Sequence, residues 1–265
     1  MAAEELHWTH KLFVEHAELF LPFLEAAKDR APAEVEVLLN KFNEFGVPQN
    51  AKVLDLACGI GRHSIPLSQQ GYTVVGFELS PLYVQKAGEQ AKEAGIDAAF
   101  VQGDVRNVSH LLEDHAPFDA IINMFTSHGY YGKESDLKLF SALHELAAPN
   151  ALLIVETANR DFLVRHFQQD GLMESPTVQI QEHRKFNYET SCMEVTWELF
   201  QRQGDDLKHR LSLDLKLRAY SLHELRGVLE EAGWVYLTGL SRREETTEMV
   251  PLSPDQLRMW VVARA

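Results

Sequence analysis

Four carboxylate or amide side chains stand in or just after short apolar runs of the sequence, at positions that suit ligand binding. They are Asp55, Glu78, Asp104 and Asn123. A carboxylate inside a buried strand costs free energy unless it is hydrogen-bonded or paired, and a cationic ligand can supply that pairing. Because α/β sheets bind ligands at the carboxyl ends of their strands, the four side chains predict a site for a cationic ligand at one sheet edge.

The first apolar run is followed by a turn that contains Gly59 and Gly61. Glycine lets the backbone turn sharply and lets a ligand approach it closely. A nicotinamide-binding fingerprint needs a third glycine at the position of Ser64, so that motif is not met. Glu78 closes the second run, where an acidic side chain can accept both hydroxyls of a ribose. The pattern favours a nucleoside over a pyrophosphate-containing ligand.

The elements that position these residues are short apolar runs separated by helical patterns. The predicted strands cover residues 53–57, 73–77, 98–102, 118–123 and 151–156, and the predicted helices cover residues 62–70, 81–95 and 134–147. Strands that alternate with helices in this way form right-handed crossovers and a parallel sheet covered on both faces.

Residues 176–220 break this rhythm. Apolar residues alternate with polar ones at 193–199 and at 211–217, and residues 178–186 form a weaker third candidate. Period-two alternation is typical of antiparallel strands with one buried face, so we expect a small antiparallel insertion. The α/β pattern then resumes with a helix at 222–232 and strands at 234–238 and 258–263.

Two amphipathic helices are predicted ahead of the first strand, at residues 4–29 and 33–45, from apolar residues spaced three, four or seven apart. Pro22 lies inside the first pattern and could split that helix. We expect Trp8, His10 and Lys11 of the first helix to cover the bound ligand.

Composition narrows the class of protein. The 265 residues carry a formal net charge of −14, which argues against nucleic-acid binding because phosphate contacts need clustered Lys and Arg. Two cysteines are too few for a disulfide framework, and no apolar run has the length of a membrane helix. Residues 1–11 lack the basic-then-apolar layout of a signal peptide. We therefore expect a cytoplasmic enzyme without a membrane partner; the oligomeric state stays open.

Several segments are recognisable together. VLDLACGIGRHSIPL, VVGFELS, VQGDVR and FDAIINMFTSHGYY resemble, in order and spacing, the signature segments of class I S-adenosylmethionine-dependent methyltransferases, and AGW…RMWVVARA resembles that family's closing strand pair. The resemblance covers residues 51–160 and 221–265. It implies a doubly wound, seven-stranded mixed sheet of order 3-2-1-4-5-7-6 whose last strand is antiparallel, with N-terminal helices and an antiparallel β insertion.

The same resemblance implies a division of the chain and a set of cofactor contacts. Residues 1–50 would form a helical cap, 51–170 and 221–265 a Rossmann-like core, and 171–220 a substrate lid. Glu78 would hold the ribose, although Asp is also frequent there. Asp55, Gly59 and Gly61 would contact the methionine and sulfonium end, Asn123 the methionine amine region, and Asp104 and Val105 the adenine. The predicted cofactor set is completed by Ala57, Arg62, Leu79 and Met124. Arg62 could pair with the methionine carboxylate.

Residues 126–131 follow the fourth strand and should flank the transferred methyl group. His128 can accept a proton near neutral pH, and Tyr130 could wall or hydrogen-bond the acceptor. Packing under the lid is the alternative role for both. Methyl transfer can take much of its rate from positioning, so the chemistry does not require a catalytic base.

We therefore predict transfer of a methyl group from S-adenosylmethionine to nitrogen or oxygen of a small molecule, with S-adenosylhomocysteine as product and no metal. The alternatives are an RNA or protein methyltransferase, or a non-catalytic S-adenosylmethionine-binding module. The net charge disfavours RNA, and a binding module would lack an open acceptor pocket beside Asn123. Cys58 and Cys192 lie in neither a Pro-Cys pair nor a C-x-x-C, which argues against a covalent nucleophile or a zinc site.

Overall fold

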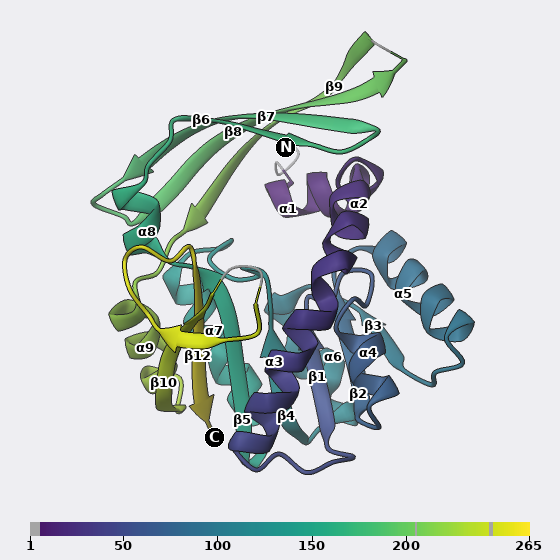
Figure 1. The fold of residues 1–265 in the computed structure, drawn as a ribbon, viewed down its shortest axis with the longest axis vertical. Coiled ribbons are helices and arrows are strands. Elements are labelled where there is room, and N and C mark those ends of the chain that lie inside the picture. Colours follow the sequence, from purple (N-terminus) through teal and green to yellow (C-terminus); the bar gives the residue numbers. More distant parts are fainter. Residues whose placement is uncertain (1–5, 205, 244–245) are drawn as a thin grey trace, which may run out of the picture.

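The computed structural model describes residues 6–204, 206–243 and 246–265, so residues 4 and 5 of the first predicted helix lie outside the described residues. It contains a large mixed sheet covered by helices and a smaller antiparallel sheet above it (Figure 1). The N-terminal helices lie between the two sheets. In the described part of the chain, no helix is both long and apolar enough to cross a membrane.

The large sheet has eight strands in the order β11-β10-β12-β5-β4-β1-β2-β3. The strands β1 to β5 pair in parallel, whereas β12 is antiparallel to both β5 and β10. The predicted count of seven is wrong, because β11 adds an antiparallel edge strand to β10; its three residues are too few to show a period. The strands are β1 (Lys52–Leu56), β2 (Thr73–Glu78), β3 (Ala99–Gln102), β4 (Phe118–Asn123), β5 (Ala147–Ala158), β10 (Val235–Arg242), β11 (Met249–Pro251) and β12 (Arg258–Arg264).

Two apolar layers cover the faces of this sheet. On one face the strands bury their side chains against α6 (Val108–Leu112), α7 (Lys133–Glu145) and α9 (Leu222–Glu231). On the other face they pack against α3 (Ala31–Glu44) and α4 (Ser64–Gln69), while α5 (Pro81–Glu93) contacts β2 and β3. Burial on both faces explains why the parallel strands are nearly continuous apolar runs. Three further short helices follow in the core: η3 (Val105–Asn107), η4 (Glu113–His115) and α8 (Arg160–Arg165).

The second sheet contains four antiparallel strands in the order β6-β7-β8-β9. They are β6 (Asp170–Glu174), β7 (Val178–Asn187), β8 (Cys192–Gln203) and β9 (Asp206–Arg218). Three correspond to the predicted alternating segments, and β6 starts before the predicted insertion. One face of the sheet packs its apolar residues against Trp8, Leu12 and Leu19, so the N-terminal helices fill the space between the sheets.

The N-terminal segment is divided more finely than its sequence predicts. It forms α1 (Trp8–His10), a π-helical turn η1 (Lys11–Glu15), α2 (Ala17–Ala26) and η2 (Ala27–Arg30), which continues into α3. The break falls at His16, whose φ of −129° and ψ of 32° are not helical, and not at Pro22, which lies inside α2. Beyond the break, α2 runs from beneath the small sheet down toward α3 (Figure 1).

Candidate functional site

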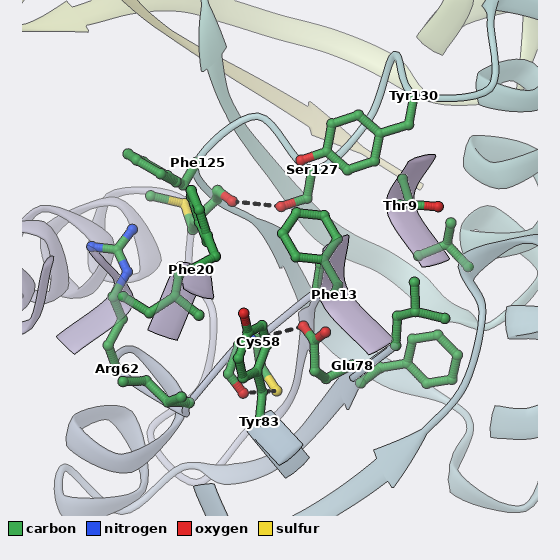
Figure 2. A pocket seen from close by; sticks show the side chains of 18 of the residues that line it. Thr9, Phe13, Phe20, Cys58, Arg62, Glu78, Tyr83, Phe125, Ser127 and Tyr130 are labelled. Atoms are coloured by element: carbon green, nitrogen blue, oxygen red, sulfur yellow. Dashed lines mark hydrogen bonds between the residues drawn. The ribbon is translucent and has the colours of Figure 1, made fainter. Parts of the chain in front are cut away.

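A cavity opens at the carboxyl ends of β1, β2 and β4 (Figure 2). Its other side comes from the N-terminal helices, whose lining residues are Thr9, Phe13, Phe20 and Leu24. The predicted site residues that line it are Ala57, Gly59, Arg62, Glu78, Leu79, Asp104, Val105, Met124 and Tyr130. The edge of the parallel sheet therefore carries a cavity where the strand-end pattern predicts one.

Glu78 ties the β1 turn to the end of β2. Its carboxylate accepts hydrogen bonds from the backbone N–H of Gly59 at 3.0 Å and of Ser80 at 2.9 Å. Burial raises the pKa of Glu78. Ala57 and Gly59 have positive φ, and a side chain on Gly59 would find only Leu24 Cδ1, at 3.7 Å. The turn thus leaves room for a ligand beside a carboxylate that is already anchored.

Asp104 and Tyr131 line another part of the cavity, and Arg106, which lies outside its lining, contacts both of them. Arg106 donates from Nε and Nη2 to the two carboxylate oxygens of Asp104, at 3.0 and 2.7 Å. Burial opposes ionisation of Asp104, but these hydrogen bonds outweigh it and lower its pKa. The guanidinium lies 4.4 Å from the centroid of the Tyr131 ring, and the Tyr131 hydroxyl is 2.8 Å from Thr9 Oγ1. An aromatic and apolar slot with one acidic side chain suits a purine base.

Arg62 lines the cavity and pairs with a carboxylate from α3. Glu34 accepts from Arg62 Nη1 and lies 2.8 Å from His63 Nε2. Burial opposes ionisation of Glu34, but the hydrogen bond to His63 and the charge of Arg62 outweigh it and lower the pKa of Glu34 to about 2. Glu34 therefore links α3 to the glycine turn, a contact that sequence spacing did not reveal.

Three of the predicted cofactor residues do not line the cavity. Asp55 is 1% exposed and accepts from Ser64 Oγ at 2.6 Å, so it anchors the start of α4. Asn123 is fully buried and donates from Nδ2 to the carbonyl oxygen of Leu56 at 3.3 Å. Gly61 faces Ile65 and Ala87. These three residues therefore contact the strands and helices next to the turn and do not reach the cavity.

His128 also lies outside the main cavity. It borders a smaller neighbouring cavity that shares Val105, Ser127, Tyr130 and Tyr131 with the main one. Its Nδ1 donates to Asn123 Oδ1 at 3.0 Å, and its Nε2 has no hydrogen-bond partner among the described residues. Burial lowers the pKa of His128, which favours the neutral imidazole. Ser127 and Tyr130, which line both cavities, therefore lie between His128 and the main cavity.

The loop after β4 is strained where it borders the cavity. Phe125 and Thr126 have φ values of 66° and 60°, a region that side chains rarely adopt. Glu156 fixes this shape: it accepts from the Phe125 N–H at 2.7 Å through its carboxylate and from the Thr126 N–H at 3.0 Å through its carbonyl oxygen. The strain places the Phe125 ring at the cavity, on the same side as Arg62 (Figure 2).

Sequence reasoning missed most of the aromatic lining. Phe13, Phe20 and Leu24 belong to the predicted apolar stripe of the first helix, but periodicity does not tell whether a stripe faces a core or a cavity. Thr9 lines the cavity, whereas the predicted Trp8, His10 and Lys11 are absent from its lining. Among the described residues, no group of three or more His, Cys, Asp or Glu side chains is placed to hold a metal ion.

The chain resembles known methyltransferases in sequence and in structure. Residues 53–150 match the methyltransferase domain family. A protein of Geobacillus sp. (strain WCH70), named provisionally as a methyltransferase, is 25% identical over 83% of this chain and 89% of its own length. The glycine/sarcosine N-methyltransferase of Parasynechococcus marenigrum (strain WH8102) is 31% identical over 51% of this chain and 46% of its own length.

A solved structure extends the likeness to almost the whole fold. The S-adenosylmethionine-dependent methyltransferase from Clostridium acetobutylicum ATCC 824 superposes with a TM-score of 0.76 at 17% sequence identity, covering 94% of this chain and 97% of that one. The likeness in structure shows a Rossmann-like methyltransferase fold over almost the whole chain, and residues 53–150 carry a methyltransferase domain. The chain is therefore a methyltransferase.

Proposed function

We propose that this enzyme transfers a methyl group from S-adenosylmethionine to a nitrogen or oxygen atom of a small-molecule acceptor. The observation that carries the proposal is one continuous cavity, which joins the polar strand ends to an aromatic compartment closed by Phe13, Phe20, Phe125 and Tyr130. Such a compartment suits a compact organic acceptor. The net charge of −14 supports this choice over RNA.

The residues of the cavity fit S-adenosylmethionine. We assign Glu78 to the ribose hydroxyls, Asp104 with Val105 to the adenine, and Arg62 to the methionine carboxylate. The bound cofactor supplies a methyl group on a cationic sulfur. A cation suits a cavity that contains two carboxylates, whereas a pyrophosphate would be repelled by them.

The enzyme's own contribution is to hold the acceptor and exclude water. The Tyr130 hydroxyl points toward Ser127 on the acceptor side of the cavity (Figure 2). Burial raises the pKa of Tyr130, so this hydroxyl remains a neutral hydrogen-bonding group. Alignment of the acceptor lone pair is then the main source of rate. Residues 171–220 are proposed as the lid and residues 1–50 as the cap of this compartment.

Calorimetry tests the cofactor part of this proposal. S-adenosylmethionine and S-adenosylhomocysteine should bind, whereas NAD should not. Glu78→Ala should weaken cofactor binding by about 1–3 kcal/mol, because the ribose loses a charged acceptor and the Gly59 N–H loses its anchor. The matched control is Glu89→Ala, which removes an exposed carboxylate from α5 and should leave the affinity unchanged.

An affinity for S-adenosylhomocysteine that is the same in Glu78→Ala and in the unchanged protein would remove Glu78 from the site.

The identity of the acceptor requires a second measurement. A metabolite extract incubated with labelled cofactor should yield a labelled small molecule detectable by mass spectrometry, and labelling confined to RNA or protein would contradict a small-molecule acceptor.

A further inference from the structure

Three guanidinium groups lie around the ring of Phe125, which lines the cavity; of the three arginines, Arg62 lines the cavity itself, and Arg30 and Arg258 contact the ring from outside the lining. The guanidinium carbons of Arg30, Arg62 and Arg258 lie 5.2, 5.3 and 5.0 Å from the centroid of the Phe125 ring. Each cation–π contact is favourable, but three cations around one ring repel one another. The ring itself is 38% exposed although it lines the cavity. This cluster, the Phe125 arginine cluster, is not used by the cofactor assignments except at Arg62.

Two of the three cations have dedicated carboxylates. Arg62 pairs with Glu34, and Arg258 pairs with Glu156 through Nε and Nη2. Arg30 is exposed, and among the described residues it has no ion pair within 4 Å. The cluster therefore carries one positive charge more than its carboxylates neutralise, and that charge lies beside Phe125, which is itself partly exposed.

The strained loop shows that this arrangement is built and not incidental. Phe125 and Thr126 both occupy the left-handed region, a strained conformation that persists only where surrounding contacts impose it. Glu156 and Arg258 impose it here, since Arg258 Nη1 also donates to Thr126 Oγ1 at 3.1 Å. The same two residues that hold the strain bring a guanidinium to the ring.

We propose that the methyl acceptor carries an anionic oxygen group, of the carboxylate type, that binds beside Phe125 against the guanidinium of Arg30. This inference rests on the proposed function, because it concerns the acceptor of that reaction. A planar guanidinium binds a carboxylate through paired N–H donors. The acceptor body then lies over Phe125, toward Phe20 and Tyr130.

Paired probes test the proposal on the protein saturated with S-adenosylhomocysteine. The pairs are benzoate with benzamide, phenylacetate with phenylacetamide, and hexanoate with hexanamide, so that charge changes while shape is kept. At least one carboxylate should bind about tenfold more tightly than its amide, and added salt should reduce the difference because Arg30 is exposed. Calorimetry or NMR titration measures both affinities.

Variants assign the effect to Arg30. Arg30→Ala should abolish the preference for carboxylates and leave S-adenosylhomocysteine affinity within twofold. Lys28→Ala, which removes a cation from the same short helix η2, should keep the preference. The proposal is overturned if no carboxylate binds, if amides bind equally well, or if Arg30→Ala weakens S-adenosylhomocysteine and leaves the probes unaffected, since Arg30 would then serve the cofactor. Failure of S-adenosylhomocysteine itself to bind would contradict the proposed function as well.

Discussion

His128 is held by its neighbours in a way that limits what it can do. Its Nδ1–H donates to Asn123, and Asn123 donates to the backbone of β1, so the imidazole orients the end of β4. Its Nε2 is buried without a hydrogen-bond partner among the described residues, and His128 lines the smaller cavity together with Tyr130. This geometry favours a positioning role over direct proton removal from the acceptor.

The kinetics of His128→Ala separate these two roles. For positioning, the variant should mainly raise the acceptor KM, lower kcat by less than about tenfold, and keep the shape of the pH–rate profile. For a general base, kcat should fall by roughly 10²–10⁴ and one ionisation should disappear from the profile. His110→Ala, on the exposed surface of α6, is the control. A thousand-fold fall in kcat with an altered profile would show that the positioning role is wrong.

Among single residues, the sequence could predict the position of those that stand at the end of a strand; their roles toward the cofactor stay predictions. Glu78, Asp104 and the glycine turn were predictable because parallel strands end at one edge. The sequence could not show that Asp55 and Asn123 are buried away from the cavity, because both are polar and stand at strand ends as Glu78 and Asp104 do. Which of two strand-end carboxylates reaches a cavity depends on side-chain direction, and here Ser64 draws Asp55 away.

At the scale of elements, α3 is coupled to the glycine turn by Glu34. The pKa of Glu34 in the folded protein is about 2, against an ordinary value of 4.5. Because the folded state holds the ionised carboxylate, this contact stabilises the protein above about pH 4.5, and the stabilisation is lost as the pH falls from 4.5 toward 2. Glu34→Gln should lower the free energy of unfolding at neutral pH and flatten its decline over that pH range.

Chemical denaturation at several pH values between 3 and 7 measures this dependence. Glu36→Gln on the same helix is the matched control, since its carboxylate is exposed and accepts only from Thr247 at 3.3 Å among the described residues. It should leave the pH dependence of the free energy of unfolding unchanged. If Glu34→Gln retains the full decline in acid, the Arg62–Glu34–His63 contact does not couple α3 to the turn.

Elements with strong periodicity were predictable, and those fixed by local geometry were not. The five parallel strands, α9 with its Ser221 capping box, and the alternating strands β8 and β9 follow from their patterns. The break at His16 leaves no mark in the apolar spacing, since the stripe continues across it through Phe13 and Phe20. Similarly, β11 is three residues long and exists because β10 offers it an edge.

At the scale of the whole molecule, the antiparallel sheet reaches the cavity through the N-terminal helices. Trp197 on β8 stacks on Phe20 with ring centroids 5.8 Å apart and planes 15° apart, and Phe20 lines the cavity. Trp197 is in turn fixed by Glu182, which accepts from its Nε1 at 2.7 Å and pairs with Arg184. If this sheet acts as the proposed lid through α2, a change at Trp197 should alter the binding of both the cofactor and the acceptor.

Trp197→Leu tests this connection. The loss of the indole removes the surface on which Phe20 rests and leaves Glu182 without its indole donor, so both the cofactor Kd and the acceptor KM should rise several-fold. The free energy of unfolding should fall by roughly 1–3 kcal/mol. Phe200→Leu is the matched control, because Phe200 lies on the same strand and packs edge-on against His209 instead of against the N-terminal helices. If Trp197→Leu raises the acceptor KM and leaves the cofactor Kd as it is in Phe200→Leu, the sheet contacts the acceptor directly and does not act through α2.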